Sequence, residues 1–221
     1  MAVIHHTVLK PTKLELLTSW LPSRPWYRGG AGGPELAKAG GFRLDDPEGE
    51  VGIEFLVTTD TSGPDPVSYL VPLTYRGAPL DGAEHALVGT MEHGVLGRRW
   101  AYDACHDPVA VARSAALLAG RAQAQDQNVS DAVDREVVVS RTGEGPASAA
   151  TDFAAFTTAD TEESTRLTTP RGATLHLHRV LRPAPDGPSP APHGAIGHVT
   201  GTWRTPDGSR VRGMFAALYP A

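Results

Sequence analysis

The chain has 221 residues, enough for one large domain or two small ones with a buried core. Hydrophobic residues make up 40% and charged residues 20%, which is close to the globular average and excludes a wholly disordered chain. The formal net charge is -5 and no long block of like charges occurs, which argues against nucleic acid or an anionic membrane as the main partner.

The single cysteine and the first residues bear on location. Cys105 has no second cysteine with which to form an intramolecular disulfide. The start, MAVIHHTVLK, lacks the basic stretch and apolar core of a secretory signal, and no apolar run approaches the roughly 18 residues of a membrane span. We therefore expect a cytoplasmic protein.

The first expected elements are a strand and a short helix. Residues 2–9, AVIHHTVL, are rich in β-branched residues and predict an opening strand. Thr12 and Glu15 then have the spacing of a helical capping box, and Pro22 predicts the end of that helix. The apolar stripe of the helix consists of Leu14, Leu17 and Leu21, flanked by Trp20.

Two alternating segments follow. EVGIEFLVTT, residues 50–59, places Val51, Ile53, Phe55 and Val57 on one face, which is typical of a half-buried antiparallel strand. PVSYLVPLTY, residues 66–75, repeats the pattern, and DTSGPDP between them has the composition of a turn. These segments predict a hairpin, in which Pro72 indicates an edge strand or a bulge.

Two short strands around Gly94 and Gly97 and a second helix are expected next. Asp107 is a suitable N-cap, Pro108 suits the first helical position, and Gly120 ends the helix. The alanines of this helix predict close packing on a sheet.

The remaining chain is β-rich after a polar connection. RAQAQDQNVSDAVD, residues 121–134, predicts a surface linker and the best internal boundary. Strands are expected in REVVVSR, TLHLHRVL, GAIGHVTGTW and RVRGMFAAL, with RTPDGS as a hairpin turn between the last two. We therefore predict a domain over residues 1–120, the linker over 121–134, and a β-rich extension over 135–221 that could continue the same sheet.

Histidines supply the candidate metal ligands. His176 and His178 alternate on an expected strand, so they share a face with side chains roughly 7 Å apart. A third ligand would come from His198, which we place on the neighbouring strand, or from His193 in a loop. Zinc needs three or four convergent ligands and no local cluster guarantees them, so we favour a partly exposed sheet face over a metal site.

Other catalytic patterns are weak. No Gly-x-Ser-x-Gly elbow occurs, and the Gly-rich stretch RGGAGGPELAKAGG lacks the ending of a Walker loop. Glu92 and His93 are adjacent, as are His106 and Asp107, so the two side chains of each pair do not face each other. Cys105 is either a thiol activated by His106 or, as we favour, a buried structural cysteine.

Three segments together resemble a known domain. TKLELLTSWLPSRPWYRG, GGFRLDDPEGEVGIEFLVTTD and SYLVPLTYRGAPLDGAEHALVGTMEHGVLGRRWAYDACHDP resemble, in order and spacing, the N-terminal cap domain of actinobacterial maltokinases and related sugar kinases. The resemblance covers about residues 1–120 and fades beyond Gly120. It implies an α+β fold, with a curved antiparallel sheet packed on two short helices in a cystatin-like arrangement, and a role in regulation or partner recruitment.

The kinases of that family place an essential lysine and a His-x-Asp loop after the cap. Here no lysine occurs after Lys38, and none of the nine histidines is followed two residues later by aspartate. Phosphoryl transfer depends on such positioned groups, and about 100 residues after Gly120 are too few for the usual helical lobe. The resemblance therefore implies a free-standing cap with a β-rich extension, which needs no cofactor.

The aromatic turn at the end of the first helix has two interpretations. Trp20 packs on the sheet while Trp26 and Tyr27 staple the turn, or Trp26 and Tyr27 partly face solvent and anchor a protein partner or a sugar ring. Further candidates for stacking on a sugar are Tyr69, Tyr75 and Trp100 on the sheet face.

We therefore expect a non-catalytic accessory or regulatory protein of glycogen and other α-glucan, maltose or trehalose metabolism, whose partner is a protein such as a kinase or trehalose synthase. One alternative is a carbohydrate- or small-molecule-binding module that uses the concave sheet face. Another is a small metal-dependent enzyme that uses His176 and His178. Edge strands without evident protection also allow a homodimer.

Overall fold

The computed structural model describes residues 9–30, 32–141, 152–184 and 191–221. Two α-helices, α1 (Lys13–Trp20) and α2 (Pro108–Leu118), accompany the described strands. In chain order the strands are β1 (Leu9–Lys10), β2 (Leu36–Leu44), β3 (Gly52–Asp60), β4 (Val67–Arg76), β5 (Leu87–His93), β6 (Gly97–Asp103), β7 (Val138–Arg141), β8 (Thr157–Asp160), β9 (Ser164–Thr168), β10 (Thr174–His178), β11 (Val180–Leu181), β12 (Gly197–Arg204) and β13 (Arg210–Tyr219).

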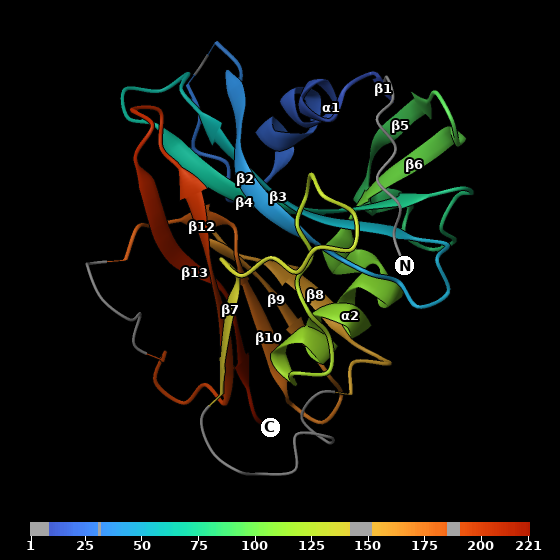
Figure 1. Cartoon of the computed structure of the whole chain (residues 1–221), viewed down its shortest axis with the longest axis vertical. Coiled ribbons are helices and arrows are strands. Elements are labelled where there is room, and N and C mark those ends of the chain that lie inside the picture. The colour runs from blue at the N-terminus through green and yellow to red at the C-terminus, as the bar shows by residue number, and fades with distance from the viewer. Residues whose placement is uncertain (1–8, 31, 142–151, 185–190) are drawn as a thin grey trace.

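These strands form one curved antiparallel sheet (Figure 1). Its order is β1-β5-β6-β4-β3-β2-β12-β13-β10-β9-β8, with β11 paired to β4 and β7 paired to β12. Strands from the first and second halves of the chain are therefore neighbours at two places, β2 with β12 and β4 with β11. The expectation of mostly antiparallel sheet with two short helices is confirmed. Of the strand expected over residues 2–9, only Leu9 lies within the described residues.

Local signals fix both helices as expected. The Thr12 hydroxyl accepts from the Glu15 N–H, and the Glu15 carboxylate accepts from the Thr12 N–H, which completes the capping box of α1. Asp107 caps α2 by accepting from the Val109 N–H, and Gly120 follows that helix with a φ of 72°. The longer helix, α2, has 11 residues, whereas a membrane crossing needs roughly 20.

The two helices cover opposite faces of the hairpin formed by β3 and β4. Leu17 of α1 packs in one cluster with Leu56, while Phe55 packs in a second cluster with Val111 of α2. Both faces of β3 are therefore buried, and Glu54 is only 5% exposed. The expectation of a half-buried strand is wrong here, because α1 covers the face that alternation alone leaves to solvent.

Pro72 lies in an interior strand whose pairing with β3 shows no register shift, so the expectation of an edge strand or a bulge was wrong. The Leu70 N–H donates to the Arg179 carbonyl next to β11, and the Pro72 nitrogen two residues later faces that same side. The β4 pairing on that side changes from β11 at Tyr69 to β6 at Leu73. Pro72 falls between these two partners, where no ladder donor is needed.

Three strands were missed in the sequence: β2, β8 and β9. The first lies in the Gly-rich stretch, where Gly40 and Gly41 weaken any strand signal. A Cβ at Gly40 would lie 3.2 Å from the Thr202 carbonyl oxygen, so the glycine allows β12 to approach. Gly41 has a φ of 126°, and a Cβ there would lie 2.0 Å from the Phe55 carbonyl oxygen.

The segment expected as a surface linker lies against the sheet. The Gln125 N–H donates to the Arg43 carbonyl, and the Arg43 N–H donates back to the Gln125 carbonyl. Ala124 beside it is buried in the core. The segment is therefore held against β2 at this point. The division of the chain into a cap over 1–120 and an extension over 135–221 stays a prediction.

Gly41→Ala tests whether β2 depends on this close approach. We expect Gly41→Ala to lower the free energy of unfolding by at least about 2 kcal/mol more than Gly49→Ala, measured by chemical denaturation. Gly49 also has positive φ, at 74°, but apart from its chain neighbours no atom of the described residues lies within 4 Å of its Cβ position. Equal losses in the two variants would contradict the packing argument.

Candidate functional site

The aromatic turn after α1 is packed into the protein. Trp26 is fully buried and Trp20 is 7% exposed, with their ring centroids 5.8 Å apart in an edge contact. Tyr69, also fully buried, lies 5.8 Å from Trp26. The half-buried Tyr27 donates its hydroxyl to Asp60 at 2.8 Å. The packing interpretation holds for Trp20 and Trp26. An exposed anchor at Trp26 and a sugar stacked on Tyr69 are both wrong, because α1 and the sheet cover these rings.

The other aromatic candidates do not share one open face. Tyr75 pairs with Ala101 and Trp100 pairs with Arg76, so Tyr75 and Trp100 point to opposite faces of the sheet. Half-buried Trp100 packs beside Tyr102. The Tyr75 hydroxyl donates to Glu54 at 2.7 Å. Tyr69, Tyr75 and Trp100 are therefore not brought together for stacking on one sugar.

Arg179 forms a buried ion pair that sequence reasoning missed. It lies between β10 and β11 and is fully buried, with Nη2 donating to the Asp103 carboxylate at 2.6 Å. Its Nε donates to the Thr165 hydroxyl at 2.7 Å, and its guanidinium lies 4.9 Å from the centroid of the Trp26 ring. An arginine directly before the apolar pair Val180 and Leu181 was the one available signal in the sequence.

Asp103 keeps the buried Arg179 guanidinium charged. Burial by itself would lower the pKa of Arg179, but the charge of Asp103 and its hydrogen bond raise it above the ordinary value. Nearby Cys105 is buried, and burial raises the pKa of its thiol, so the group stays protonated. A buried structural cysteine fits this environment, whereas a reactive thiolate needs an open, electropositive one.

Glu54, on β3, is the centre of a second charged group. Its carboxylate accepts from the Lys13 ammonium and from the Tyr75 hydroxyl. Burial alone would raise the pKa of Glu54, and the charge and hydrogen bond of Lys13 together with the bond from Tyr75 reverse this and lower it. Burial and the charge of Glu54 raise the pKa of Tyr75. This group ties the start of α1 to the hairpin.

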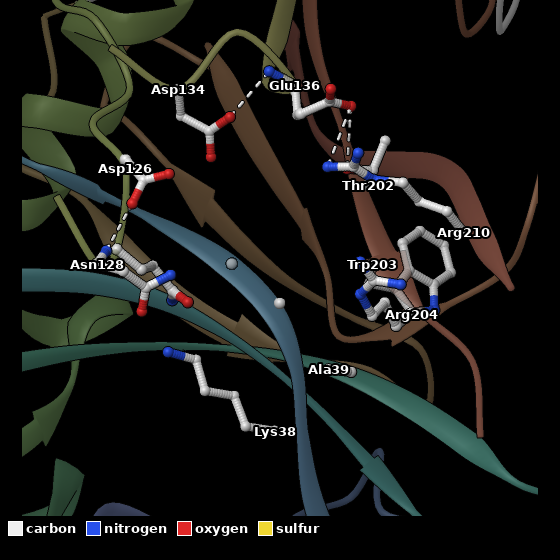
Figure 2. Close-up of a pocket in the computed structure, with 13 residues that line it drawn as sticks. Lys38, Ala39, Asp126, Asn128, Asp134, Glu136, Thr202, Trp203, Arg204 and Arg210 are labelled. Carbon is white, nitrogen blue, oxygen red and sulfur yellow. Dashed lines mark hydrogen bonds and ion pairs between the residues drawn. The ribbon is translucent and has the colours of Figure 1, made fainter. Parts of the chain in front are cut away.

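A polar cleft lies where β2 and β12 meet (Figure 2). Its volume is about 420 Å³, and the segment after α2 forms a further wall. Figure 2 shows Lys38 from β2, Asp126 and Asn128 from that segment, and Arg204 from β12 around it. The lining residues are Lys38, Ala39, Gly40, Gly41, Asp126, Gln127, Asn128, Asp134, Glu136, Thr202, Trp203, Arg204 and Arg210.

Two ionisable groups in the cleft are perturbed by it. Burial lowers the pKa of Lys38, with a smaller opposing effect from Glu54. Burial raises the pKa of Asp134, and the charges of Asp126 and Glu136 raise it further. Both groups lie where their charged form is poorly compensated.

Part of the chain that forms these sites matches a known protein family. Residues 20–107 match the family model of the maltokinase N-terminal cap domain. This segment is homologous to the maltokinase cap. The search of curated proteins found no match to the chain.

The homologous segment contributes residues to the Arg179 ion pair and to the polar cleft. It contains the aromatic turn, β2 to β6, and Asp103, whereas Arg179 lies outside it. In the cleft, Lys38 belongs to the cap, while Asp134 and Arg204 come from later parts of the chain. The Arg179 ion pair and the polar cleft thus each combine residues of the homologous segment with residues that follow it.

The candidate metal ligands lie outside the cap and do not converge. His176 and His178 are half-buried on β10 and share a face, and burial lowers the pKa of both. His198 is on β12, but β13 lies between these strands, and Ala217 pairs with both His176 and His198. The placement of His198 on the neighbouring strand was wrong. Within the described ranges, no three His, Cys, Asp or Glu residues are grouped to hold a metal ion; His193 is exposed.

Arg179→Leu tests the dependence of the fold on the buried pair. Loss of the cation leaves Asp103 buried without a counter-charge, so we expect the free energy of unfolding to fall by about 3–5 kcal/mol in chemical denaturation. The matched control is Arg182→Leu, whose exposed partner is Glu163, with an expected loss below about 1 kcal/mol. The double variant Arg179→Leu/Asp103→Leu should recover part of the loss. Similar losses in the two single variants would refute the assignment.

Glu54→Gln tests the second charged group through pH. Because the folded pKa lies below the usual 4.5, ionised Glu54 stabilises the fold above that pH, and this contribution is lost as pH falls through the folded pKa. We expect Glu54→Gln to lower stability by about 1–3 kcal/mol at neutral pH and to weaken the fall of stability in acid. Glu92→Gln, at an exposed carboxylate on β5, should keep the wild-type acid profile. An unchanged profile in Glu54→Gln would contradict the prediction.

Proposed function

We propose that this protein is a non-catalytic accessory protein of α-glucan, maltose or trehalose metabolism, which acts by binding a protein partner. The observation that carries the proposal is the match of residues 20–107 to the maltokinase cap. A domain related to part of a maltokinase supports a place beside enzymes of the same metabolism. We also propose a cytoplasmic location and a cystatin-like arrangement of the homologous segment.

The disposition of the lysines supports a role without phosphoryl transfer. Such transfer needs a positioned cation at the nucleotide phosphates, commonly a lysine. Lys10, Lys13 and Lys38 are the lysines of the sequence, and none follows the cap. Lys13 is bound by Glu54, and Lys38 faces the polar cleft. A kinase or trehalose synthase is the partner class we propose.

The exposed turn between β5 and β6 is the partner contact we propose in place of the buried aromatic turn. Val95 is 61% exposed and Leu96 is 45% exposed, and both lie within the homologous segment. Adjacent apolar side chains on an exposed turn offer area that a partner can bury. Leu87, at the start of β5, is a further exposed apolar residue of this hairpin.

Affinity capture from a cytosolic extract of the parent organism, with mass spectrometry, tests this function. We expect the wild-type protein to retain an identified enzyme of α-glucan, maltose or trehalose metabolism, and Val95→Ser/Leu96→Ser to lose it. The control is Val129→Ser/Val133→Ser, two exposed valines outside the cap that should leave capture unchanged. Capture of no such enzyme, or ATP turnover with any sugar by the pure protein, would overturn the proposal.

The proposal also includes self-association through sheet edges. β1 and β8 are at the two ends of the strand order, so each presents an unpaired edge within the described residues. Light scattering coupled to size-exclusion chromatography distinguishes a monomer from a homodimer.

A further inference from the structure

The cleft between β2 and β12 is open because these strands meet at one point. Their pairing is confined to Trp203 and Gly40, and on the same side of β12 its first half pairs with β7 instead. The segment from Asp126 to Glu136 crosses the remaining space and lines it. A volume of about 420 Å³ is within the range of small-molecule sites, roughly 300–1,000 Å³.

The cleft leaves a cation without a partner. Among the described residues, the Lys38 ammonium takes part in no ion pair, in contrast to Lys13, which binds Glu54. Lys38 stays accessible while the surrounding walls desolvate it, and its pKa is lowered. A hydrogen-bond acceptor that enters the cleft would therefore complete the site.

The charges that line the cleft sum to zero. Its cations are Lys38, Arg204 and Arg210, and its anions are Asp126, Asp134 and Glu136, which gives three of each. An anionic ligand would meet three carboxylates, and a cationic ligand would meet three basic groups. Hydroxyl groups donate to carboxylates and accept from ammonium and guanidinium groups, so a neutral ligand with several hydroxyls satisfies both.

We propose that this cleft binds a neutral polyhydroxylated small molecule, a mono- or disaccharide, with Lys38 as donor and Asp126 and Asp134 as acceptors. Asn128 adds an amide that can both donate and accept. Trp203 is 2% exposed, so it closes the floor of the cleft and offers no free ring for stacking. Recognition here depends on hydrogen bonds, unlike the aromatic sugar site expected from the sequence.

The class of ligand follows from the cleft alone, whereas the choice of sugars rests on the proposed function. Isothermal titration calorimetry of the full chain should show binding of maltose or trehalose. Spermidine and glucose 1-phosphate are the cationic and anionic probes, and both should bind more weakly. Tighter binding of either charged probe, or no heat with maltose, trehalose or glucose up to millimolar concentrations, would overturn the inference.

Substitutions in the cleft distinguish sugar binding at this site from weak binding elsewhere on the protein surface. Lys38→Met keeps the apolar stem and removes the ammonium, and we expect it to weaken sugar binding about tenfold or more. Asp134→Asn should weaken it as well. The controls Lys10→Met on β1 and Glu92→Gln on β5 should bind as the wild type does. Equal affinity of Lys38→Met and Lys10→Met would refute the site, and partner capture by Lys38→Met reports on the proposed function separately.

Discussion

The guanidinium of Arg179 is the charged group on which the joining of both parts of the chain depends. It comes from the strands that follow the homologous segment, and two of its partners, Asp103 and the ring of Trp26, lie within that segment. A fully buried charge is tolerated only when its partners hold it in a fixed geometry. The pair therefore specifies how β10 and β11 lie against the cap, so that β11 pairs with β4.

The same constraint explains why the aromatic turn is not a binding surface. Trp26 lies under α1 and against Tyr69, and the Arg179 cation approaches its ring from the other part of the chain. Glycines allow the turn to close, because a Cβ at Gly29 would overlap the Tyr27 hydroxyl. Tyr27 in turn binds Asp60 at the end of β3. The aromatic residues next to the glycines are covered by structure from elsewhere in the sequence.

The cap and the residues after it meet a second time at β2 and β12, with a different result. Next to β11 the contact is a buried ion pair, whereas at Gly40 and Trp203 it is a single pairing beside an open polar cleft. β2 and β12 pair only at Gly40 and Trp203. Because each strand keeps its own twist, the two strands separate on either side of that pairing. A cleft at such a junction can take its lining residues from both parts. The partner contact we propose lies at the turn between β5 and β6, whereas the sugar site we propose lies where β2 and β12 meet.

The sequence by itself determined the features that depend on neighbouring residues: the capping box at Thr12, the N-cap at Asp107, the hairpin of β3 and β4, and the turn at Gly208. It also carried the resemblance to the cap. Only the tertiary structure decided the burial of Trp26, the place of Pro72 in an interior strand, the strand that contains Gly40 and Gly41, and the separation of His176 from His198 by β13. Each of these depends on which distant strand lies alongside. Alternation and capping act over a few residues, whereas Arg179 and Asp103 are 76 residues apart in the chain and meet only when the sheet is complete.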